Sequence, residues 1–362
     1  MANFPDGVMS DAQIGAMIDS GAISAERPLL AGQIQPASLD LRLGQTAYRV
    51  RASFLAGRGK TVSERLDIFK MHEMQLSDGA VLEKGCVYVV PLMESLSLPP
   101  EMSGAASAKS SIGRLDLLTR IITDDGTEFD RIPHGYDGPL YVEICPRSFS
   151  VVARAGQMLN QIIFRVGKTV LTDDGLRDLH KETPIVSGEA VISEGLGFSV
   201  DLQPEGTDLV GYRAKPHTGV VDLDRLNHYE PGDFWEEIRT NEGRIILDPG
   251  AFYILVSREA ITIPPDCAAE MAPYLAMVGE FRVHYAGFFD PGFGFDGAGG
   301  SGSRGVLEVR CHEAPIVLEH GQVVGRLVYE KMAEVPRQLY GQGIKSNYQG
   351  QGLKLSKHFK TR

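Results

Sequence analysis

The 362-residue sequence has no apolar run of 18 residues, one tryptophan and only four cysteines. The missing apolar run argues against a transmembrane helix, and the first residues lack the basic and apolar stretches of a secretory signal. The cysteines, Cys86, Cys145, Cys267 and Cys311, are not paired at metal-binding or redox spacing. We therefore expect reduced, mostly buried thiols and a cytoplasmic protein without a membrane partner.

Positive charge is also scarce. The chain has 36 Lys and Arg against 47 Asp and Glu, a formal net charge of −11. Proteins that bind extended DNA or RNA are usually basic, so this balance argues against a nucleic-acid partner. A small anionic ligand is still compatible with it, because such a ligand needs only a local group of donors and cations.

Three common catalytic signatures are incomplete or missing. AGRGKT (56–61) is similar to a phosphate-binding loop, but Phe54 occupies the position of its first glycine. The P-C-x-x-C element of zinc deaminases and the G-x-S-x-G of serine hydrolases do not occur. The sequence therefore argues against a P-loop NTPase, a zinc deaminase and a serine hydrolase.

What the chain does have is a pattern of strands and turns. Glycine is abundant, with 41 residues, and short apolar runs rich in β-branched residues recur between turn signals. These runs are VYVVPL (87–92), LYVEI (140–144), MLNQIIF (158–164), AFYILVS (251–257), VLEVR (306–310) and VVGRLVY (323–329). The best helix candidate is SDAQIGAMIDS (10–20), with Ser10 as N-cap and Gly21 after its end. We predict a mainly β protein with few short helices.

The chain repeats itself at a constant spacing of 165 residues. VLEKGCVYVVPLMESLSLPPE (81–101) matches ILDPGAFYILVSREAITIPPD (246–266). Further pairs at this spacing are Glu143 with Glu308 and Gly156-Gln157 with Gly321-Gln322. Upstream, SLDLRLG (38–44) echoes SVDLQPE (199–205) at a slightly shorter spacing. One spacing held over several anchors predicts a tandem duplication of a β domain.

The duplication suggests the domain boundaries. We place the first domain at 1–170 and the second, which ends in a C-terminal tail, at 191–362. The polar stretch 171–190 is predicted to link them.

The two copies differ where chemistry is expected. KSSIGR (109–114) in the first copy corresponds to YLAMVG (274–279), which has neither the serines nor the cations. Conversely, FFDPGFG (288–294) carries Asp290 before a Pro-Gly turn, where the first copy has Pro133. If one site is built from both copies, the first supplies serines and cations and the second supplies acids.

KSSIGR has the composition of an anion site. Serine hydroxyls and backbone N–H groups in a turn form a concave nest, and Lys109 and Arg114 add charge-assisted donors. This combination suits a di- or triphosphate. The alternative is an ordinary helix start, with Ser110 as its N-cap and Arg114 in solvent.

Glu308 lies within an apolar strand, RGVLEVR. A carboxylate there is costly to bury unless it is hydrogen-bonded or used, so Glu308 is a candidate general base. The alternative is a glutamate on the solvent face of a strand.

The tail (339–362) is rich in glycine, glutamine and lysine, and is either a disordered end or a segment that closes over a ligand.

Together these segments resemble the dCTP deaminase family, relatives of the trimeric dUTPases, in a long and internally duplicated form. The resemblance covers nearly the whole chain. The segments that carry it are the starting helix, IQPASLDLRLG (34–44), KSSIGR, FFDPGFG with VLE (306–308), GQVVGRLVYE (321–330) and NYQGQG (347–352). The sequence departs from the family in Lys109, where Arg is usual, and Asn347, where Lys is usual. It also has an inserted loop, FDGAGGSGS (295–303), which we expect to be flexible and close to the site.

The resemblance implies tandem β-clip (dUTPase-like) domains and a homo-oligomer with sites between domains or subunits. It implies that Glu308, Ser110 and Arg114 are catalytic. The substrate contacts that it implies are Lys109, Ser111, Asp290, Val306, Tyr340, Lys345 and Gln351.

The activity implied by the resemblance is hydrolytic deamination of dCTP to dUTP and ammonia, a step toward dTTP precursors. The reaction would use a Glu base and no catalytic zinc, and Mg²⁺ would be bound through the nucleotide triphosphate. One alternative is a dUTPase or a bifunctional enzyme, in which Asp290 activates the water. Another is a nucleotide-binding protein without catalysis. The identity of the product distinguishes the deaminase from the dUTPase or bifunctional enzyme. Turnover distinguishes both of these from a protein that only binds nucleotides.

Overall fold

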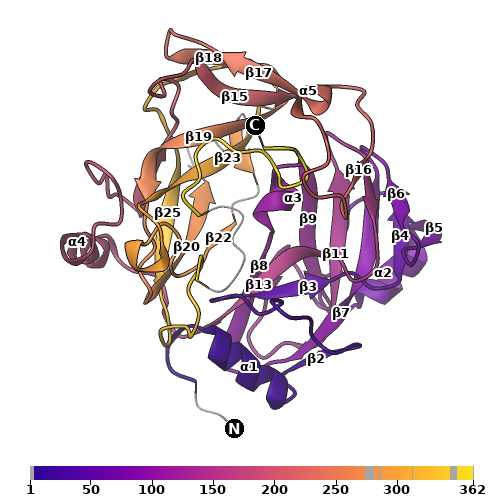
Figure 1. Cartoon of the computed structure of the whole chain (residues 1–362). Helices are drawn as coiled ribbons and strands as arrows, with labels where there is room; N and C mark the ends of the chain where they lie inside the picture. Colours follow the sequence, from indigo (N-terminus) through magenta and orange to yellow (C-terminus); the bar gives the residue numbers. More distant parts are fainter. Residues whose placement is uncertain (1–3, 274–280, 285–286, 312, 343–348, 362) are drawn as a thin grey trace. The chain divides into compact units, whose positions relative to one another are not determined.

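The computed structural model describes residues 4–273, 281–284, 287–311, 313–342 and 349–361. Over these residues the chain is mainly β with few short helices, as predicted, and it divides into two compact units (Figure 1). Unit 1 comprises Met1–Thr169, Gly219–Leu226 and Met332–Arg337. Unit 2 comprises Val170–Thr218, Asn227–Lys331 and Gln338–Arg362.

Unit 1 contains three sheets in its described part. The first has the order β5(Lys70–Gln75)-β4(Thr46–Val50)-β7(Val87–Ser97)-β11(Asp137–Pro146)-β9(Leu117–Thr123), with β2(Ile23–Ala25) on β7. The second has the order β1(Gly7–Val8)-β13(Met158–Val166)-β8(Met102–Ala108)-β10(Arg131–Ile132), with β3(Leu39–Arg42) on β13. The third is β16(Val221–Asp222)-β12(Val151–Ala153)-β6(Ala80–Leu82). Its helices are α1(Asp11–Asp19), α2(Val62–Phe69) and α3(Ser110–Gly113).

Unit 2 repeats this plan. One sheet has the order β17(Trp235–Arg239)-β15(Leu209–Ala214)-β19(Phe252–Ile261)-β23(Ser303–Cys311)-β21(Phe281–His284). Another has the order β14(Leu196–Ser199)-β25(Val323–Lys331)-β20(Cys267–Pro273)-β22(Phe288–Phe289). A third pairs β18(Arg244–Leu247) with β24(Ile316–Glu319). Its helices are α4(Asp173–Glu182), α5(Pro231–Phe234) and the short 3₁₀ turn η2(Asp296–Ala298).

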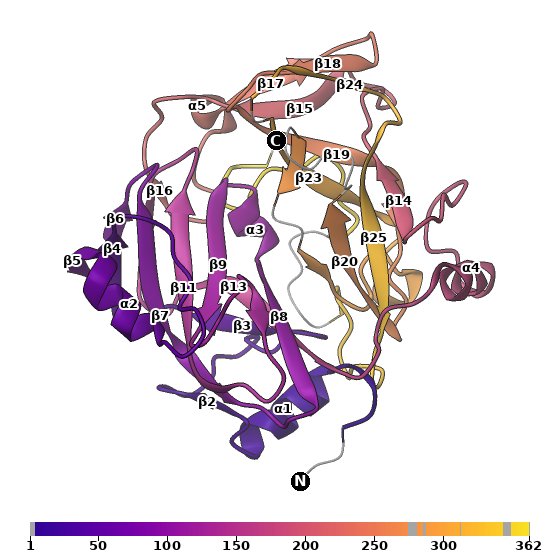
Figure 2. The same ribbon diagram turned by 180° about the vertical axis from the view of Figure 1, so that it is seen from behind.

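The strand orders confirm the predicted duplication. The triplet β7-β11-β9 of unit 1 recurs as β19-β23-β21 in unit 2. The antiparallel pair β8 and β13 recurs as β20 and β25, which run side by side in Figure 2. Corresponding strands begin 165 residues apart, as at Met102 and Cys267. The residue after β10 is Pro133 and the residue after β22 is Asp290, which supports the alignment of these two positions.

The predicted first helix is confirmed, and its sequence explains it. Ser10 and Gln13 form a capping box, in which the Ser10 hydroxyl accepts from the Gln13 N–H and the Gln13 side chain accepts from the Ser10 N–H. Ile14 and Met17 are completely buried. No helix in the described ranges is long and apolar enough to span a membrane.

Residues 171–190, expected as a linker, contain α4. Thr172 caps this helix by accepting from the Gly175 N–H, and its first and last turns carry acidic and basic residues, respectively. Leu176 is buried in the hydrophobic core of unit 2. Leu179 of the same helix packs against this core, and Ile185 and Val186 are buried in it, so the segment is part of the fold of unit 2.

All four cysteines are free thiols, as expected. Cys267 and Cys311 are buried, whereas Cys86 and Cys145 are half-buried. Burial raises the pKa of the Cys267 thiol to about 12 and also raises the pKa of Cys145. Protonated thiols of this kind are poor nucleophiles, which indicates a packing role.

The C-terminal segment is anchored in unit 2, so the interpretation as a disordered end is wrong for residues 355–361. Phe359 is buried, and its ring lies 5.4 Å from that of Phe234 and 5.9 Å from that of Trp235. The His358 carbonyl accepts from the His228 N–H at 2.9 Å. Aromatic packing and backbone hydrogen bonds thus order a segment whose composition alone suggested disorder.

This anchor yields a spectroscopic prediction, because Trp235 is the single tryptophan of the chain. Phe359→Ala removes a ring from the Trp235 environment, so we expect a red-shifted emission maximum and a loss of about 3 kcal/mol in unfolding free energy. The control is Lys360→Ala, which breaks only an exposed ion pair with Glu230 and should leave the emission unchanged. An unshifted Phe359→Ala spectrum would show that this contact does not form.

Candidate active site

The serine-pair segment forms one tight turn at the end of β8. The Lys109 N–H donates to the Leu159 carbonyl of β13 at 2.9 Å, which fixes the start of the turn to the sheet. The Lys109 carbonyl then accepts from the N–H groups of Ile112 and Gly113, at 2.8 and 3.0 Å. These bonds define α3, which has only four residues.

A helix does begin here, but the two details of the alternative, Ser110 as N-cap and Arg114 in solvent, are wrong. Lys109, not Ser110, is the N-cap residue, and no side chain caps the turn. Arg114 is 2% exposed, so it does not lie in solvent. Ser111 is also buried, while Ser110 is half-buried. A guanidinium is costly to bury, which favours a specific role for Arg114.

Lys109 is held by a residue that the sequence did not single out. Its ammonium forms an ion pair with the carboxylate of Asp40, on β3. The Asp40 side chain is 2% exposed and that of Lys109 is 23% exposed. Asp40 belongs to SLDLRLG, and the repeated segment in unit 2 pairs Asp201 with Arg304 of β23. The sequence feature that could have predicted this contact is the aspartate that both repeated segments share, Asp40 and Asp201.

The acids of unit 2 lie on one strand and one turn. Along β23, Leu307 and Val309 point into the hydrophobic core, so alternation places Val306 and Glu308 on the opposite face. Glu308 is nevertheless only 5% exposed, and the alternative of a solvent-facing glutamate is therefore wrong. Asp290, directly after β22, is also buried.

Two tail residues lie against these elements. The Tyr340 N–H donates to the Pro291 carbonyl at 2.8 Å, beside Asp290. Gln351 flanks the start of β23, where its carbonyl accepts from the Arg304 N–H and its Nε2 donates to the Arg304 carbonyl, both at 3.1 Å. Lys345 lies outside the described residues. Unit 2 therefore brings Tyr340 to the Asp290 turn and Gln351 to the strand that carries Glu308.

The inserted loop 295–303, expected to be flexible, makes defined contacts. The Gly302 N–H donates to the Gly294 carbonyl at 2.9 Å, and the Ser303 hydroxyl accepts from the Gly350 N–H at 2.7 Å. Gln349 also bonds this region and was not among the predicted site residues. The sequence feature that could have identified Gln349 is the NYQGQG motif, in which it lies.

Glu143, the counterpart of Glu308, is engaged in an internal ion pair. Its Oε1 accepts from Arg120 Nε at 3.1 Å and Nη2 at 2.5 Å, and the Glu143 side chain is 1% exposed. The Arg120 guanidinium lies 3.6 Å from the centre of the Phe129 ring. This arrangement indicates that Glu143 stabilises unit 1.

Asp130, close to this pair, has an unusual acidity. Its Oδ1 accepts from the Ile121 N–H at 2.7 Å, yet burial raises its pKa to about 7 from an ordinary 3.8. A carboxyl whose pKa is higher in the folded state loses its contribution to stability as pH rises through the folded value. Unit 1 should therefore become less stable between about pH 4 and pH 7.

Asp130→Asn should remove this dependence, because Asn keeps the acceptor oxygen and has no charge. We expect the unfolding free energy at pH 8 to rise by about 1–3 kcal/mol, with little change at pH 4. Denaturant titrations at both pH values measure it. Asp137→Asn, at an exposed position, is the control. A variant that keeps the pH dependence of the wild type would rule out Asp130 as its origin.

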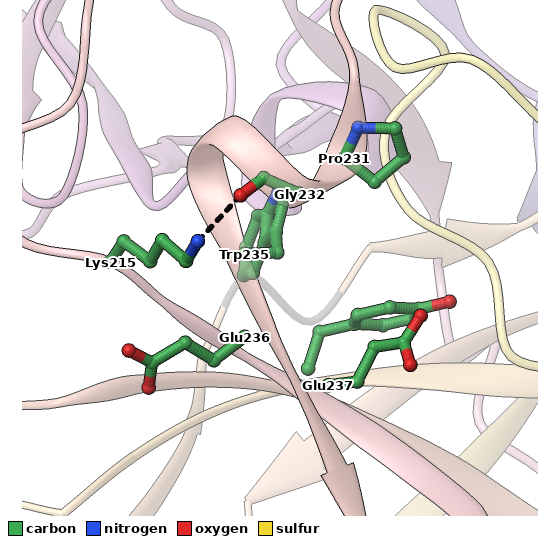
Figure 3. A pocket seen from close by; sticks show the side chains of 7 residues that line it. Lys215, Pro231, Gly232, Trp235, Glu236 and Glu237 are labelled. Carbon is green, nitrogen blue, oxygen red and sulfur yellow. Dashed lines mark hydrogen bonds between the residues drawn. The ribbon is translucent and has the colours of Figure 1, made fainter.

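Two hollows lie elsewhere in unit 2. One has a volume of about 410 Å³ and is shown in Figure 3, where the Lys215 ammonium donates to the Gly232 carbonyl beside Trp235. The other, of about 320 Å³, is bordered by the C-terminal segment. Neither lining contains a predicted site residue.

Among the described residues, no group of three or more His, Cys, Asp or Glu is arranged to hold a metal ion.

Comparison with known proteins covers nearly the whole chain. The family model "2'-deoxycytidine 5'-triphosphate deaminase (DCD) N-terminal domain" matches residues 5–168, and the corresponding C-terminal domain model matches residues 172–359. The crystal structure of 2'-deoxycytidine 5'-triphosphate deaminase from Agrobacterium tumefaciens is similar to this chain, with 53% identity and a TM-score of 0.88. That match covers 92% of this chain and 100% of the other.

Shorter matches link the chain to curated proteins. Proteins named "dCTP deaminase, dUMP-forming" from Corynebacterium kroppenstedtii and a Parafrankia species are 31% and 33% identical over 112 residues. Each match covers 31% of this chain. The chain spans little more than half of these relatives, 59% and 55% of their lengths.

Proposed function

The chain belongs to the 2'-deoxycytidine 5'-triphosphate deaminase family, and from that premise we propose that it hydrolyses the C4 amino group of dCTP. The observation that carries the proposal is Glu308, a buried carboxylate on the face of β23 that points away from the core. The products are dUTP and ammonia.

Glu308 is proposed as the general base. Its carboxylate takes a proton from water, and the resulting hydroxide adds to C4 of cytosine. Glu308 passes this proton to N3 of the cytosine as the tetrahedral intermediate forms. The hydroxyl proton of that intermediate then passes to the amino group, the C4–N bond breaks, and ammonia leaves as the C4 carbonyl forms. The Ser110 hydroxyl and a backbone group hold the water and the tetrahedral intermediate, while Arg114 keeps Glu308 ionised or supports the intermediate.

The other predicted residues are proposed to bind the substrate. Lys109 and Ser111 bind phosphates, and the Lys109–Asp40 ion pair supports this role by orienting the ammonium. The remaining contacts are Asp290 near the sugar, Val306 at the base, and Tyr340, Lys345 and Gln351 from the tail. Mg²⁺ enters with the triphosphate as part of the substrate.

Neither copy holds all of these groups, which supports a site composed of residues from both. We propose that the first copy contributes the serine segment and the second the acids, within one chain or between chains of a homo-oligomer.

A second candidate reaction is deamination followed by triphosphate cleavage. It is supported by the curated relatives, which are named dUMP-forming. Asp290, buried at a turn, is then the residue proposed to activate the second water.

Product analysis tests both candidates. The protein is given dCTP and, separately, dUTP, with Mg²⁺, and the nucleotides are resolved by ion-exchange chromatography. Accumulation of dUTP from dCTP supports the deaminase, and accumulation of dUMP supports the bifunctional enzyme. If neither nucleotide changes, the activity proposed is wrong and a nucleotide-binding role is left.

A further inference from the structure

Gln349 is bonded at both ends of its amide to the loop that follows Asp290. Its Oε1 accepts from the Gly294 N–H at 3.1 Å. Its Nε2 lies 3.2 Å from the Gly292 carbonyl and 3.4 Å from the Ala298 carbonyl, to which it donates. One side chain therefore ties together three backbone positions of this segment.

Glycines surround this amide. A Cβ atom added at Gly300 would lie 2.9 Å from Gln349 Nε2, and one added at Gly341 would lie 3.1 Å from it. Both distances are shorter than ordinary contacts of carbon, so the amide occupies space that side chains at these positions would fill. The close packing of the Gln349 amide therefore requires glycine at positions 300 and 341.

The neighbouring tail residues follow the same loop. The Gly350 N–H donates to the Ser303 hydroxyl, and Gln351 forms two hydrogen bonds with the backbone of Arg304. Residues 349–351 therefore run along the segment 292–304, which connects Asp290 to β23. A segment so rich in glycine has little intrinsic order, so its conformation depends on such bonds.

We propose that Gln349 is a positioning residue that fixes the Asp290 turn and the start of β23 through the backbone of 292–298. This inference rests on the proposed function, in which Asp290 binds the sugar and β23 carries Glu308. The three hydrogen bonds of the Gln349 side chain go to backbone atoms of the loop and not to Asp290 or Glu308. It acts because a displacement of about 1 Å in a binding group is enough to slow catalysis substantially.

The test compares Gln349→Met, Gln349→Glu and Gln342→Met. Methionine has about the length of glutamine but cannot form these hydrogen bonds. Glutamate keeps the oxygen that accepts from Gly294, but it places a negative charge, in place of the Nε2 donor, against the Gly292 and Ala298 carbonyls. Gln342, an exposed residue, donates to Gly297 of the same loop and serves as the control. We expect kcat/KM for dCTP to fall about tenfold or more in both Gln349 variants and less than about twofold in Gln342→Met.

Hydrogen exchange separates this inference from the proposed function. Peptides covering 292–304 should exchange faster in Gln349→Met than in wild type, with an unchanged melting temperature. If Gln349 only fills space, Met retains wild-type kcat/KM and exchange, and the inference is overturned. If wild type does not deaminate dCTP, the proposed function fails, while the exchange rates still decide whether Gln349 holds the loop.

Discussion

Glu308→Gln is expected to lower kcat for dCTP deamination by about 10²–10⁴-fold, because the amide cannot accept the proton of the attacking water. Glu143→Gln should keep kcat close to wild type, since Glu143 is engaged by Arg120 inside unit 1. Its effect should appear instead as a loss of about 3 kcal/mol in unfolding free energy, because the buried ion pair is broken.

Steady-state rates at saturating dCTP and denaturant titrations measure the two effects. The pair forms a matched control, since both residues occupy the same position in the repeat and both are buried. An inactive Glu143→Gln beside an active Glu308→Gln would mean that the roles of the two copies are reversed. Loss of activity in both, with normal stability, would contradict the structural role of Glu143.

Gly294→Ala should disrupt the Asp290 turn. Gly294 has a φ of 68°, and an added Cβ would lie 2.1 Å from the Ile261 carbonyl oxygen and 2.8 Å from the Ser303 nitrogen. Both contacts are backbone atoms that cannot rotate away. We expect a loss of about 3 kcal/mol in unfolding free energy, together with a marked loss of activity.

Gly299→Ala is the matched control for this substitution. Gly299 lies in the same loop with a φ of 79°, but an added Cβ would meet nothing within 4 Å. It should cost only the strain of the left-handed backbone, about 1 kcal/mol. Thermal and denaturant unfolding compare the two variants. Equal losses would show that the backbone contact at Gly294 is not formed.

The repeat made most of the fold predictable from the sequence. Strand position follows from apolar runs and turns, and the constant spacing of 165 residues makes the two halves equivalent. Helix α4 was missed because only one of its residues, Leu176, is buried, and a polar helix resembles a polar linker. Its capping residue and terminal charges were the local signals present.

The candidate site was predictable in its residue types and not in its contacts. Lys109 and Asp40 are 69 positions apart, and Gln349 and Gly292 are 57 apart. Such pairs depend on how strands are arranged, which local patterns do not specify. The burial of Arg114 also depends on the arrangement of the strands. The sequence did not predict it, because a serine pair followed by arginine is equally compatible with an ordinary helix start.

Replacement of the C4 amino group of dCTP by an oxygen from water can be measured by running the reaction in ¹⁸O-labelled water and analysing the nucleotide by mass spectrometry. Hydrolysis at C4 predicts one heavy oxygen in the uracil base and an equal amount of released ammonia. Label found only in a phosphate group, or a nucleotide recovered unlabelled, would contradict it.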